Sequence, residues 1–414
     1  MKVIADLHIH SKYARATSPS SDLDGLSEWA KIKGVNVLAT GDFTHPLWFK
    51  ELKEKLNNIN VDTGLYGYNG ANFIISGEIA LFYRVKGETK RIHIVLVCPS
   101  FEVAEQVNEY LAKKGNLEAD GRPIFSFQPT ELVETVKGIS KEVFVMLAHI
   151  WTPWFSIFGS KSGVNSIEKA FEDQTKYVDA LESGLSSDPK MNWMVSSIDK
   201  YPLVSNSDCH SPQKIGREVN LLELEELSYK NITSAIKTGK GFLKTYEFYP
   251  EEGKYHFDGH RNCDVVLSPE ETRKYKGICP VCKKELTIGV LNRVYELADR
   301  KYGEEKKNSI PFKYIVPLDK LLAKILKKSE MSKGVKEEYM RIVKYFGSEF
   351  AVYEASEEKL LLATSKEIAE GISLVNKGKI HWRPGFDGEF GDFSFEKKER
   401  KLELSKDQKT LMDY

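Results

Sequence analysis

An apolar run near the start of the chain ends in two histidines, and this pattern constrains the fold most. Residues 3–10 read Val-Ile-Ala-Asp-Leu-His-Ile-His, a run typical of a buried strand. Side chains two positions apart on a strand point to the same face, so His8 and His10 project together. A packed core histidine is the structural alternative for either one alone. With Asp6 on the same face, the pair predicts a metal site at the end of the first strand.

Length and composition indicate a globular protein with more than one domain. A single hydrophobic core stops growing near about 250–300 residues, so 414 residues predict two or three domains. No apolar window reaches the roughly 18 residues that a membrane span needs, and a strand pattern stands where a signal peptide would. We therefore expect a cytoplasmic protein with no membrane partner.

Charge and cysteine content narrow the function classes. The formal net charge is +0, which argues against a surface coated in basic patches, so any nucleic-acid contact must come from local grooves. The five cysteines include one Cys-x-x-Cys pair. They suit a reducing compartment and metal binding better than a disulfide framework.

Strand and helix patterns alternate over residues 1–249, the first predicted domain. We predict strands at residues 3–10, 35–39, 73–79, 91–97, 143–148, 178–181 and 203–206, with helices at 22–33, from 46, and at 101–114, 165–176, 189–199 and 228–239. A His, Asp or Glu follows most strands. Ligands at the carboxyl ends of nearly all strands favour a (β/α) barrel over a doubly wound sheet, which gathers ligands at one switch point.

The predicted barrel rim carries eight candidate metal ligands. They are His8, His10, Asp42, Glu78, His93, His149, Asp208 and His210. Eight donors are too many for one tetrahedral ion, so two or three divalent metals are implied. Mixed imidazole and carboxylate ligands suit Zn, Mn or Mg, with Fe as an alternative.

Clustered metals of this kind hydrolyse phosphoesters, because one lowers the pKa of a water while another holds the phosphoryl oxygens. The residues that we expect to carry the reaction are His8, His10, Glu78, His149, Asp208 and His210. The roles of three neighbouring residues have alternatives. His45 is either a metal ligand or an outer contact. We prefer a structural role for the Glu182 carboxylate and a place in the hydrophobic core for Cys209.

The segment after His149 is rich in aromatic residues. Its candidate DNA contacts are Trp151, Trp154, Phe155, Phe158 and Lys161. Exposed aromatics stack on bases for about 1–3 kcal/mol each, or hold a flipped base, and a lysine reaches phosphate. The structural alternative is a lid packed on the barrel.

Residues 250–290 predict a zinc module. His260 and Cys263 form one half, and Cys279 and Cys282 form the other after 15 intervening residues, a spacing typical of structural zinc sites. His256 is the alternative fourth ligand. Four protein ligands leave no open position, so we expect this zinc to be structural.

Residues 291–414 predict a mostly helical domain that contacts DNA. Helix patterns cover residues 286–301, 317–328 and 335–350, and residues 360–374 hold two short elements. Lys324, Lys327 and Lys328 form a DNA-facing edge or a solvated face. Residues 383–393 form a loop rich in glycine and aromatics, whose glycines permit close backbone approach.

Several motifs resemble those of the PHP (polymerase and histidinol phosphatase) superfamily. They are Asp6-Leu7-His8-Ile9-His10-Ser11, Gly77-Glu78, His93, Ala148-His149 and Ser207-Asp208-Cys209-His210. The resemblance implies an α/β fold with a distorted seven-stranded barrel, a trinuclear metal site and phosphoesterase activity. One departure is Gly41-Asp42-Phe43, where the superfamily has Thr-Asp-His.

The order of barrel, zinc module and helical tail is similar to the endonuclease Q family, an archaeal-type group of DNA repair enzymes. The phrases at residues 40–46, 256–263 and 384–391 resemble that family's own. The resemblance implies cleavage 5′ of a deaminated base (hypoxanthine, uracil or xanthine) or an abasic site, with the base extruded into a pocket. The rivals are a histidinol-phosphatase-like enzyme and a nucleic-acid-binding protein without activity.

The last residues predict a partner. Gln408, Leu411 and Tyr414 have the spacing at which a sliding-clamp (PCNA) peptide begins. The alternative is a chance match.

Overall fold

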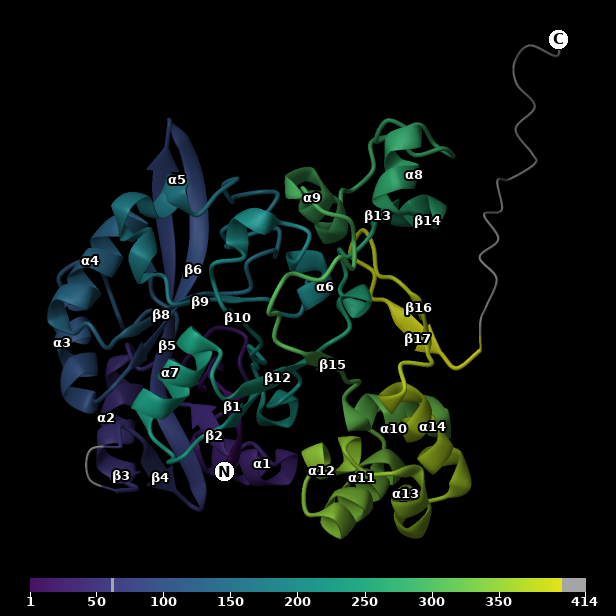
Figure 1. Ribbon diagram of the computed structural model, residues 1–414, viewed down its shortest axis with the longest axis horizontal. Helices are drawn as coiled ribbons and strands as arrows, with labels where there is room; N and C mark the ends of the chain where they lie inside the picture. The colour runs from purple at the N-terminus through teal and green to yellow at the C-terminus, as the bar shows by residue number, and fades with distance from the viewer. Residues whose placement is uncertain (61–62, 397–414) are drawn as a thin grey trace.

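A curled mixed sheet forms the larger part of the fold in the computed structural model, which describes residues 1–60 and 63–396 (Figure 1). Within these residues the sheet has 13 strands, with the path β10-β9-β8-β6-β5-β2-β1-β11-β12-β15 and with β3, β4 and β7 off it. The strands are β1 (Lys2–Asp6), β2 (Val37–Ala39), β3 (Asn57–Asn58), β4 (Tyr66–Tyr68), β5 (Ala71–Val85), β6 (Glu88–Cys98), β7 (Ile124–Phe125), β8 (Phe144–Leu147), β9 (Ala180–Glu182), β10 (Leu203–Val204), β11 (Val219–Glu223), β12 (Phe242–Glu247) and β15 (Phe312–Tyr314).

Helices surround this sheet and make up most of the C-terminal part. They are α1 (Leu23–Lys33), α2 (Pro46–Lys55), α3 (Phe101–Ala112), α4 (Pro129–Ile139), α5 (Glu168–Phe171), α6 (Pro189–Asn192), α7 (Tyr229–Thr238), α8 (Pro269–Lys274), α9 (Val290–Leu297), α10 (Leu318–Leu326), α11 (Lys333–Phe346), α12 (Glu349–Tyr353), α13 (Glu357–Ala363) and α14 (Lys366–Asn376). Two small hairpins complete the fold, β13 (Asp258–His260) with β14 (Val265–Leu267), and β16 (His381–Arg383) with β17 (Asp392–Ser394).

The sheet curls so that its β10 end approaches β1. Beyond the two strands, Ile9 and Cys209 form an isolated parallel bridge. The His10 N–H donates to the Cys209 carbonyl at 3.0 Å, and the Asp208 N–H donates to the His8 carbonyl at 2.9 Å. The ends of the first and last predicted strands therefore lie side by side.

Both faces of the sheet are buried, as the continuous apolar runs predict. In β6, Ile94 and Leu96 pack in one core cluster, whereas Val95 and Val97 pack in another on the opposite face. This alternation is the period-2 geometry of a strand.

The first helix begins and ends where the sequence indicates. Asp22 caps α1 by accepting the Gly25 N–H at 2.9 Å, and Gly34 ends it in the left-handed conformation with φ of 86°. Most predicted helices have counterparts in the structure, but the stretches at residues 165–176 and 189–199 contain only the four-residue helices α5 and α6 followed by 3-10 turns.

The strands predicted at residues 73–79 and 91–97, with no helix between them, are the longer strands β5 and β6. These strands form one long antiparallel hairpin with no helix between them. Lys86 and Gly87 make its two-residue turn, both with positive φ, as a type I′ turn requires. Further strands beyond those predicted, among them β11, β12 and β15, extend the sheet.

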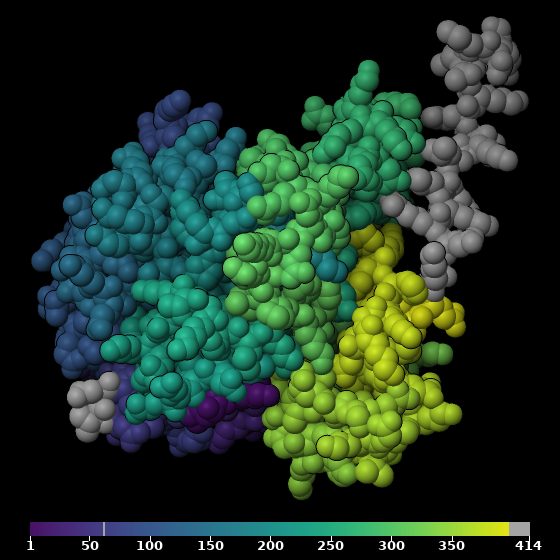
Figure 2. Space-filling model, in the orientation of Figure 1, coloured from purple at the N-terminus to yellow at the C-terminus, as the bar shows by residue number. Residues whose placement is uncertain are grey.

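The C-terminal part adds one strand to the main sheet and forms a separate helical core. The strand β15 joins the main sheet by pairing in parallel with β12. The helices α10–α14 enclose their own apolar core, which includes Leu321, Ile342 and Ile372. In Figure 2 their surface meets that of the N-terminal segment along one edge of the molecule. In the described ranges, no helix combines the length and the apolar character needed to cross a bilayer.

Candidate metal centre and adjoining surfaces

Seven of the predicted metal ligands converge in three overlapping groups. They are His8, His10 and Glu78; His10, Asp208 and His210; and Glu78, His93 and His149. Within each group the candidate ligand atoms lie within 4.8 Å of one another. Because His10 and Glu78 each belong to two groups, the three potential cation positions adjoin one another.

Strand ends and the long hairpin bring these side chains together. His8 and His10 follow β1, His149 follows β8, and Asp208 and His210 follow β10. Glu78 lies within β5 and His93 within β6, close in register because Ala80 pairs with His93.

Two ligands and one neighbour hold unusual backbone conformations. The φ angle is 29° at His149, 46° at Asp208 and 46° at Asp42. A positive φ is uncommon for residues other than glycine, and such strain concentrates at functional sites, where the surrounding structure enforces it. All three lie at or beside the cluster.

Glu78 is the central carboxylate and is fully buried. Its Oε1 lies 2.7 Å from His93 Nδ1 and 3.0 Å from His149 Nε2, and its Oε2 accepts from Arg122 at 3.0 Å. Burial raises the pKa of Glu78, but the imidazoles of His93 and His8 outweigh it and hold that pKa well below its ordinary value. The carboxylate of Glu78 is therefore ionised.

Three inward-facing atoms of the cluster are buried without a hydrogen-bond partner among the described residues, although His10 Nε2 lies 3.1 Å from Asp208 Oδ1. Within the described ranges, His8 Nε2, His10 Nε2 and Asp208 Oδ1 make no hydrogen bond of good geometry. Unsatisfied buried polar atoms are costly, so a group of them aimed at one another indicates missing partners. The donor set therefore fits divalent cations.

Outer carboxylates fix how the first two histidines face the centre. His8 Nδ1 lies 3.0 Å from Glu182 Oε2, and His10 Nδ1 lies 2.9 Å from Asp42 Oδ1. A proton on Nδ1 donated to a carboxylate leaves Nε2 free to bind a metal. Burial lowers the pKa of His8, yet Glu182 and Glu78 raise it to about 9, so a cation bound at this histidine would displace a proton.

Asp42, predicted as a ligand, does not join the three groups. Its Oδ1 faces His10, and its Oδ2 accepts from the Ser11 N–H at 2.6 Å and the Ser11 hydroxyl at 2.7 Å. With both oxygens engaged, its contacts orient His10. Glu182 is structural, as preferred, since it also accepts the His149 N–H at 2.8 Å.

Two further residues near the cluster, Cys209 and His45, have defined surroundings in the structure. Cys209 is fully buried, in agreement with its assignment to the core. The His45 ring stacks on Tyr13, with centroids 4.3 Å apart, and lies outside the three ligand groups.

Arg122 was not found from the sequence. It lies in a loop before β7, away from the predicted strand ends, so no periodicity marks it. Its guanidinium contacts Glu78, and the neighbouring Gly121 is so close to Asp42 that a Cβ would lie 2.6 Å from Oδ2. This loop therefore closes one side of the cluster.

Two of the predicted DNA contacts lie in the core. Trp151 and Phe158 are buried, with ring centroids 4.9 Å apart, and the Trp151 Nε1–H donates to Asn192 at 2.8 Å. As placed, neither ring offers a stacking surface. By contrast, Trp154 is 45% exposed and Lys161 is exposed, while Phe155 is half-buried against His93.

A pocket of about 190 Å³ adjoins the cluster. Thr152, Trp154, Lys254, Tyr255 and His256 are among the residues that line it. The Thr152 hydroxyl lies 2.9 Å from His149 Nδ1, so the pocket begins one contact away from a candidate ligand. Burial lowers the pKa of His256 to about 3, which leaves its imidazole neutral.

The four predicted zinc ligands gather as expected. The ligand atoms of His260, Cys263, Cys279 and Cys282 lie within 4.8 Å of one another. His256, the alternative ligand, is not in this group and lines the pocket instead.

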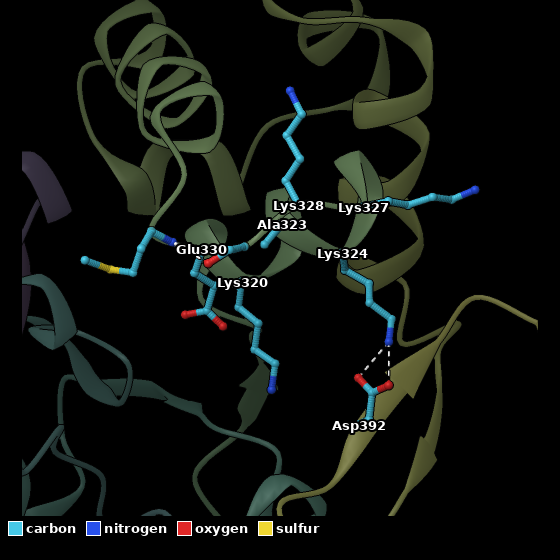
Figure 3. Close-up of a pocket in the computed structure, with 9 residues that line it drawn as sticks. Lys320, Ala323, Lys324, Lys327, Lys328, Glu330 and Asp392 are labelled. Atoms are coloured by element: carbon cyan, nitrogen blue, oxygen red, sulfur yellow. Dashed lines mark hydrogen bonds and ion pairs between the residues drawn. The ribbon is translucent and has the colours of Figure 1, made fainter.

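A basic hollow of about 880 Å³ lies between α10 and β17 (Figure 3). Lys320 contacts Glu252 at 2.6 Å, and Lys324 contacts Asp392 at 2.6 Å. Lys327 and Lys328 extend away from these pairs in Figure 3. The hollow thus carries more positive than negative charge.

Comparison with known proteins points to one group. No protein-family model matches the chain. An uncharacterized Methanocaldococcus jannaschii protein, MJ0043, is 33% identical over 272 residues, which are 64% of this chain and only 33% of that protein. An uncharacterized Bacillus subtilis protein, YqxK, is 28% identical over 412 residues, covering 94% of this chain and 98% of that one.

Two solved structures are similar over nearly the whole chain. One is the lesion-specific endonuclease PfuEndoQ from Pyrococcus furiosus, with a TM-score of 0.85, 30% identity and 95% coverage of both chains. The other is Endonuclease Q in complex with a 27-mer duplex that carries an abasic lesion at the active site. It has a TM-score of 0.84 and 30% identity, covering 97% of this chain and 99% of that one.

Proposed function

Because this chain belongs to the endonuclease Q family, we propose that it is a DNA repair endonuclease specific for lesions. Its substrate would be duplex DNA with a deaminated base (hypoxanthine, uracil or xanthine) or an abasic site, cut at the phosphodiester 5′ of the lesion. The observation that carries the proposal is the convergence of seven predicted ligands in three adjoining groups.

The metals proposed are two or three divalent ions, Zn, Mn or Mg, held by the three overlapping groups. When bound, they would lower the pKa of a water and stabilise the charge of the phosphoryl oxygens. The chain itself orients the donors through Asp42 and Glu182, and Arg122 balances the buried charge of Glu78. We propose that these residues pre-organise the site before DNA arrives.

The curled sheet supports the barrel that the sequence predicts. We propose that β1, β2, β5, β6, β8, β9 and β10 form a distorted seven-stranded ring, closed by the bridge between Ile9 and Cys209. The other strands would then be extensions of this ring. The predicted domain boundaries at residues 249 and 290 remain predictions.

The pocket beside His149 is the proposed place for an extruded base. Its volume of about 190 Å³ is well above the roughly 10–15 Å³ that one water needs, so it has room for a larger group. Trp154 and Tyr255, whose rings lie 6.0 Å apart, offer aromatic surface there. We keep Trp154, Phe155 and Lys161 as the proposed DNA contacts and withdraw the buried pair Trp151 and Phe158.

Two further parts of the prediction remain proposals. A structural zinc at Cys279, Cys282, Cys263 and His260 would hold the module that forms one side of this pocket. The lysines of the basic hollow would contact the DNA backbone, because clustered positive charge is what backbone binding needs.

The sliding-clamp residues Gln408, Leu411 and Tyr414 lie outside the described residues, so that partner rests on sequence alone.

A matched set of duplexes tests the proposed function. Each would carry one deoxyinosine, one deoxyuridine, one abasic site or no lesion, incubated with protein and Mg, Mn or Zn. We expect a nick 5′ of the lesion and none in the undamaged duplex. Equal cutting of all duplexes would contradict lesion specificity. Phosphate release from a small phosphomonoester without any nick would instead support the histidinol-phosphatase-like alternative.

A further inference from the structure

Phe390 is a large apolar side chain held out in solvent. It is 70% exposed and lies in the turn between β16 and β17. Its neighbour in the same turn, Phe386, is 1% exposed and packs inward. One ring of the turn thus anchors it while the other points away from the protein.

The turn that carries Phe390 is fixed by backbone contacts. The N–H groups of Gly385, Gly388 and Gly391 donate to the carbonyls of Glu251, Lys254 and Glu252 at 2.7, 3.0 and 3.0 Å. A Cβ at Gly391 would collide with the Glu251 carbonyl, so only glycine permits this approach. The exposed ring therefore stands on a rigid support.

Asp387 provides the other fastening of this turn. One of its carboxylate oxygens accepts the Arg261 N–H at 2.8 Å, and the other accepts the Thr287 hydroxyl at 2.6 Å. Both partners belong to the region of the predicted zinc module. The position of Phe390 is thus tied to that module as well as to residues 251–254.

Phe390 contacts one of the residues that line the pocket beside the candidate metal cluster. The Lys254 ammonium lies 4.5 Å from the centre of the Phe390 ring, and Lys254 also lines the pocket. On the pocket's other side, Thr152 touches the candidate ligand His149. A chain of contacts therefore leads from the exposed Phe390 ring to Lys254, then to the pocket, and then to the candidate metal ligand His149.

We propose that Phe390 is a wedge that enters the base stack at the lesion and fills the space left by the extruded nucleotide. Apolar side chains inserted between base steps unstack and kink DNA in many proteins. Lys254, beside the ring, contacts the adjoining phosphate. This inference rests on the proposed function, because it assumes that the substrate is a duplex lesion.

The test compares Phe390→Ala with the wild type on one lesion in two contexts. In a fully paired duplex the wedge must help to open the stack, whereas in a short unpaired bubble the stack is already open. We expect Phe390→Ala to nick the paired substrate at least about tenfold more slowly, with little loss on the bubble. Phe390→Trp keeps a flat apolar ring and is expected to preserve nicking of the paired substrate.

Matched controls separate the wedge from a general loss of apolar surface. Tyr345→Ala removes another exposed aromatic ring, 56% exposed on α11, and is expected to change neither substrate. Equal melting temperatures for all variants would show that folding is intact. Equal nicking of the paired duplex by Phe390→Ala and wild type overturns the proposal, as does an equal loss on both substrates.

A binding readout distinguishes this inference from the proposed function. With 2-aminopurine next to the lesion, wild type is expected to raise the fluorescence on binding and Phe390→Ala is not. A wild type that opens the stack without nicking would overturn the proposed function and support the wedge. A Phe390→Ala variant that opens the stack as fully as wild type overturns the wedge, whatever the cleavage result.

Discussion

Lys33 and Glu349 form a buried ion pair between α1 and α12, with Nζ and Oε2 2.5 Å apart. Their side chains are 5% and 4% exposed. The hydroxyls of Tyr339 and Tyr353 also donate to Glu349, and the Leu318 N–H donates to it at 3.2 Å. This network joins the C-terminal helices to the part of the chain that holds the candidate metal ligands.

Removing one partner of this pair should destabilise the protein. Lys33→Met leaves the buried Glu349 carboxylate without a counter-charge, so we expect a loss of about 3–5 kcal/mol in the free energy of unfolding. The double variant Lys33→Met with Glu349→Gln should recover part of it. Urea denaturation measures both. The exposed pair Lys50 and Glu54 is the control, since Lys50→Met should cost no more than about 1 kcal/mol. A loss at Lys33 no larger than the control's would argue against a coupling role.

Asp42 should act on metal affinity through His10. Asp42→Asn weakens the hold on His10 Nδ1 while leaving every inward donor in place, so we expect metal affinity to fall about 10–100-fold with unchanged stoichiometry. Glu78→Gln removes a carboxylate shared by two groups and should lower the number of bound metals. Titration calorimetry and elemental analysis separate the two effects. A lower metal count for Asp42→Asn would show that Asp42 is a ligand after all.

Zinc binding by His260, Cys263, Cys279 and Cys282 should be independent of metal binding by the cluster on the main sheet. Cys279→Ser removes one of the four gathered ligands, so we expect loss of one zinc per chain and faster proteolysis within residues 250–290. Cys98→Ser is the control, because Cys98 is buried outside that group. Unchanged zinc content in Cys279→Ser would refute the structural zinc.

The two tryptophans after His149 should behave differently. Trp151→Ala empties a buried site and should cost about 3–5 kcal/mol of stability. Trp154→Ala should leave the melting temperature unchanged and weaken binding to lesion DNA by about 1–3 kcal/mol, the value of one stacked base. Thermal melts and fluorescence anisotropy test both. Equal DNA affinity for Trp154→Ala and wild type would remove Trp154 from the DNA-binding surface.

The metal centre was predictable to the extent that its chemistry follows strand periodicity. His8 and His10 share a face because a strand repeats every two residues. The matching His-x-x-Cys and Cys-x-x-Cys spacings marked the four candidate zinc ligands. The sequence did not predict the role of Arg122 because this residue contacts Glu78 from a loop that carries no periodic pattern. Its contact with Glu78 exists only in the folded chain.

Burial and partner choice could not be obtained from the sequence. Trp151 and Trp154 are three residues apart in one aromatic segment, and nothing in their local pattern tells the buried ring from the exposed one. Likewise, the role of Asp42 depends on Ser11 and Gly121, which tertiary folding brings against it. Strand and helix positions were easier because local periodicity and capping determine them.

The central claim is that the clustered side chains hold cations which cut DNA, and metal-dependent nicking of a single-lesion duplex tests it most directly. Chelator-treated protein would be mixed with a duplex carrying one deoxyinosine, with and without added Mn²⁺, and the break mapped to the nucleotide. We predict a cut 5′ of the lesion only with metal, abolished in His8→Ala and Asp208→Asn while circular dichroism stays unchanged. Full cutting by either folded variant, or cutting that persists without metal, would contradict the account.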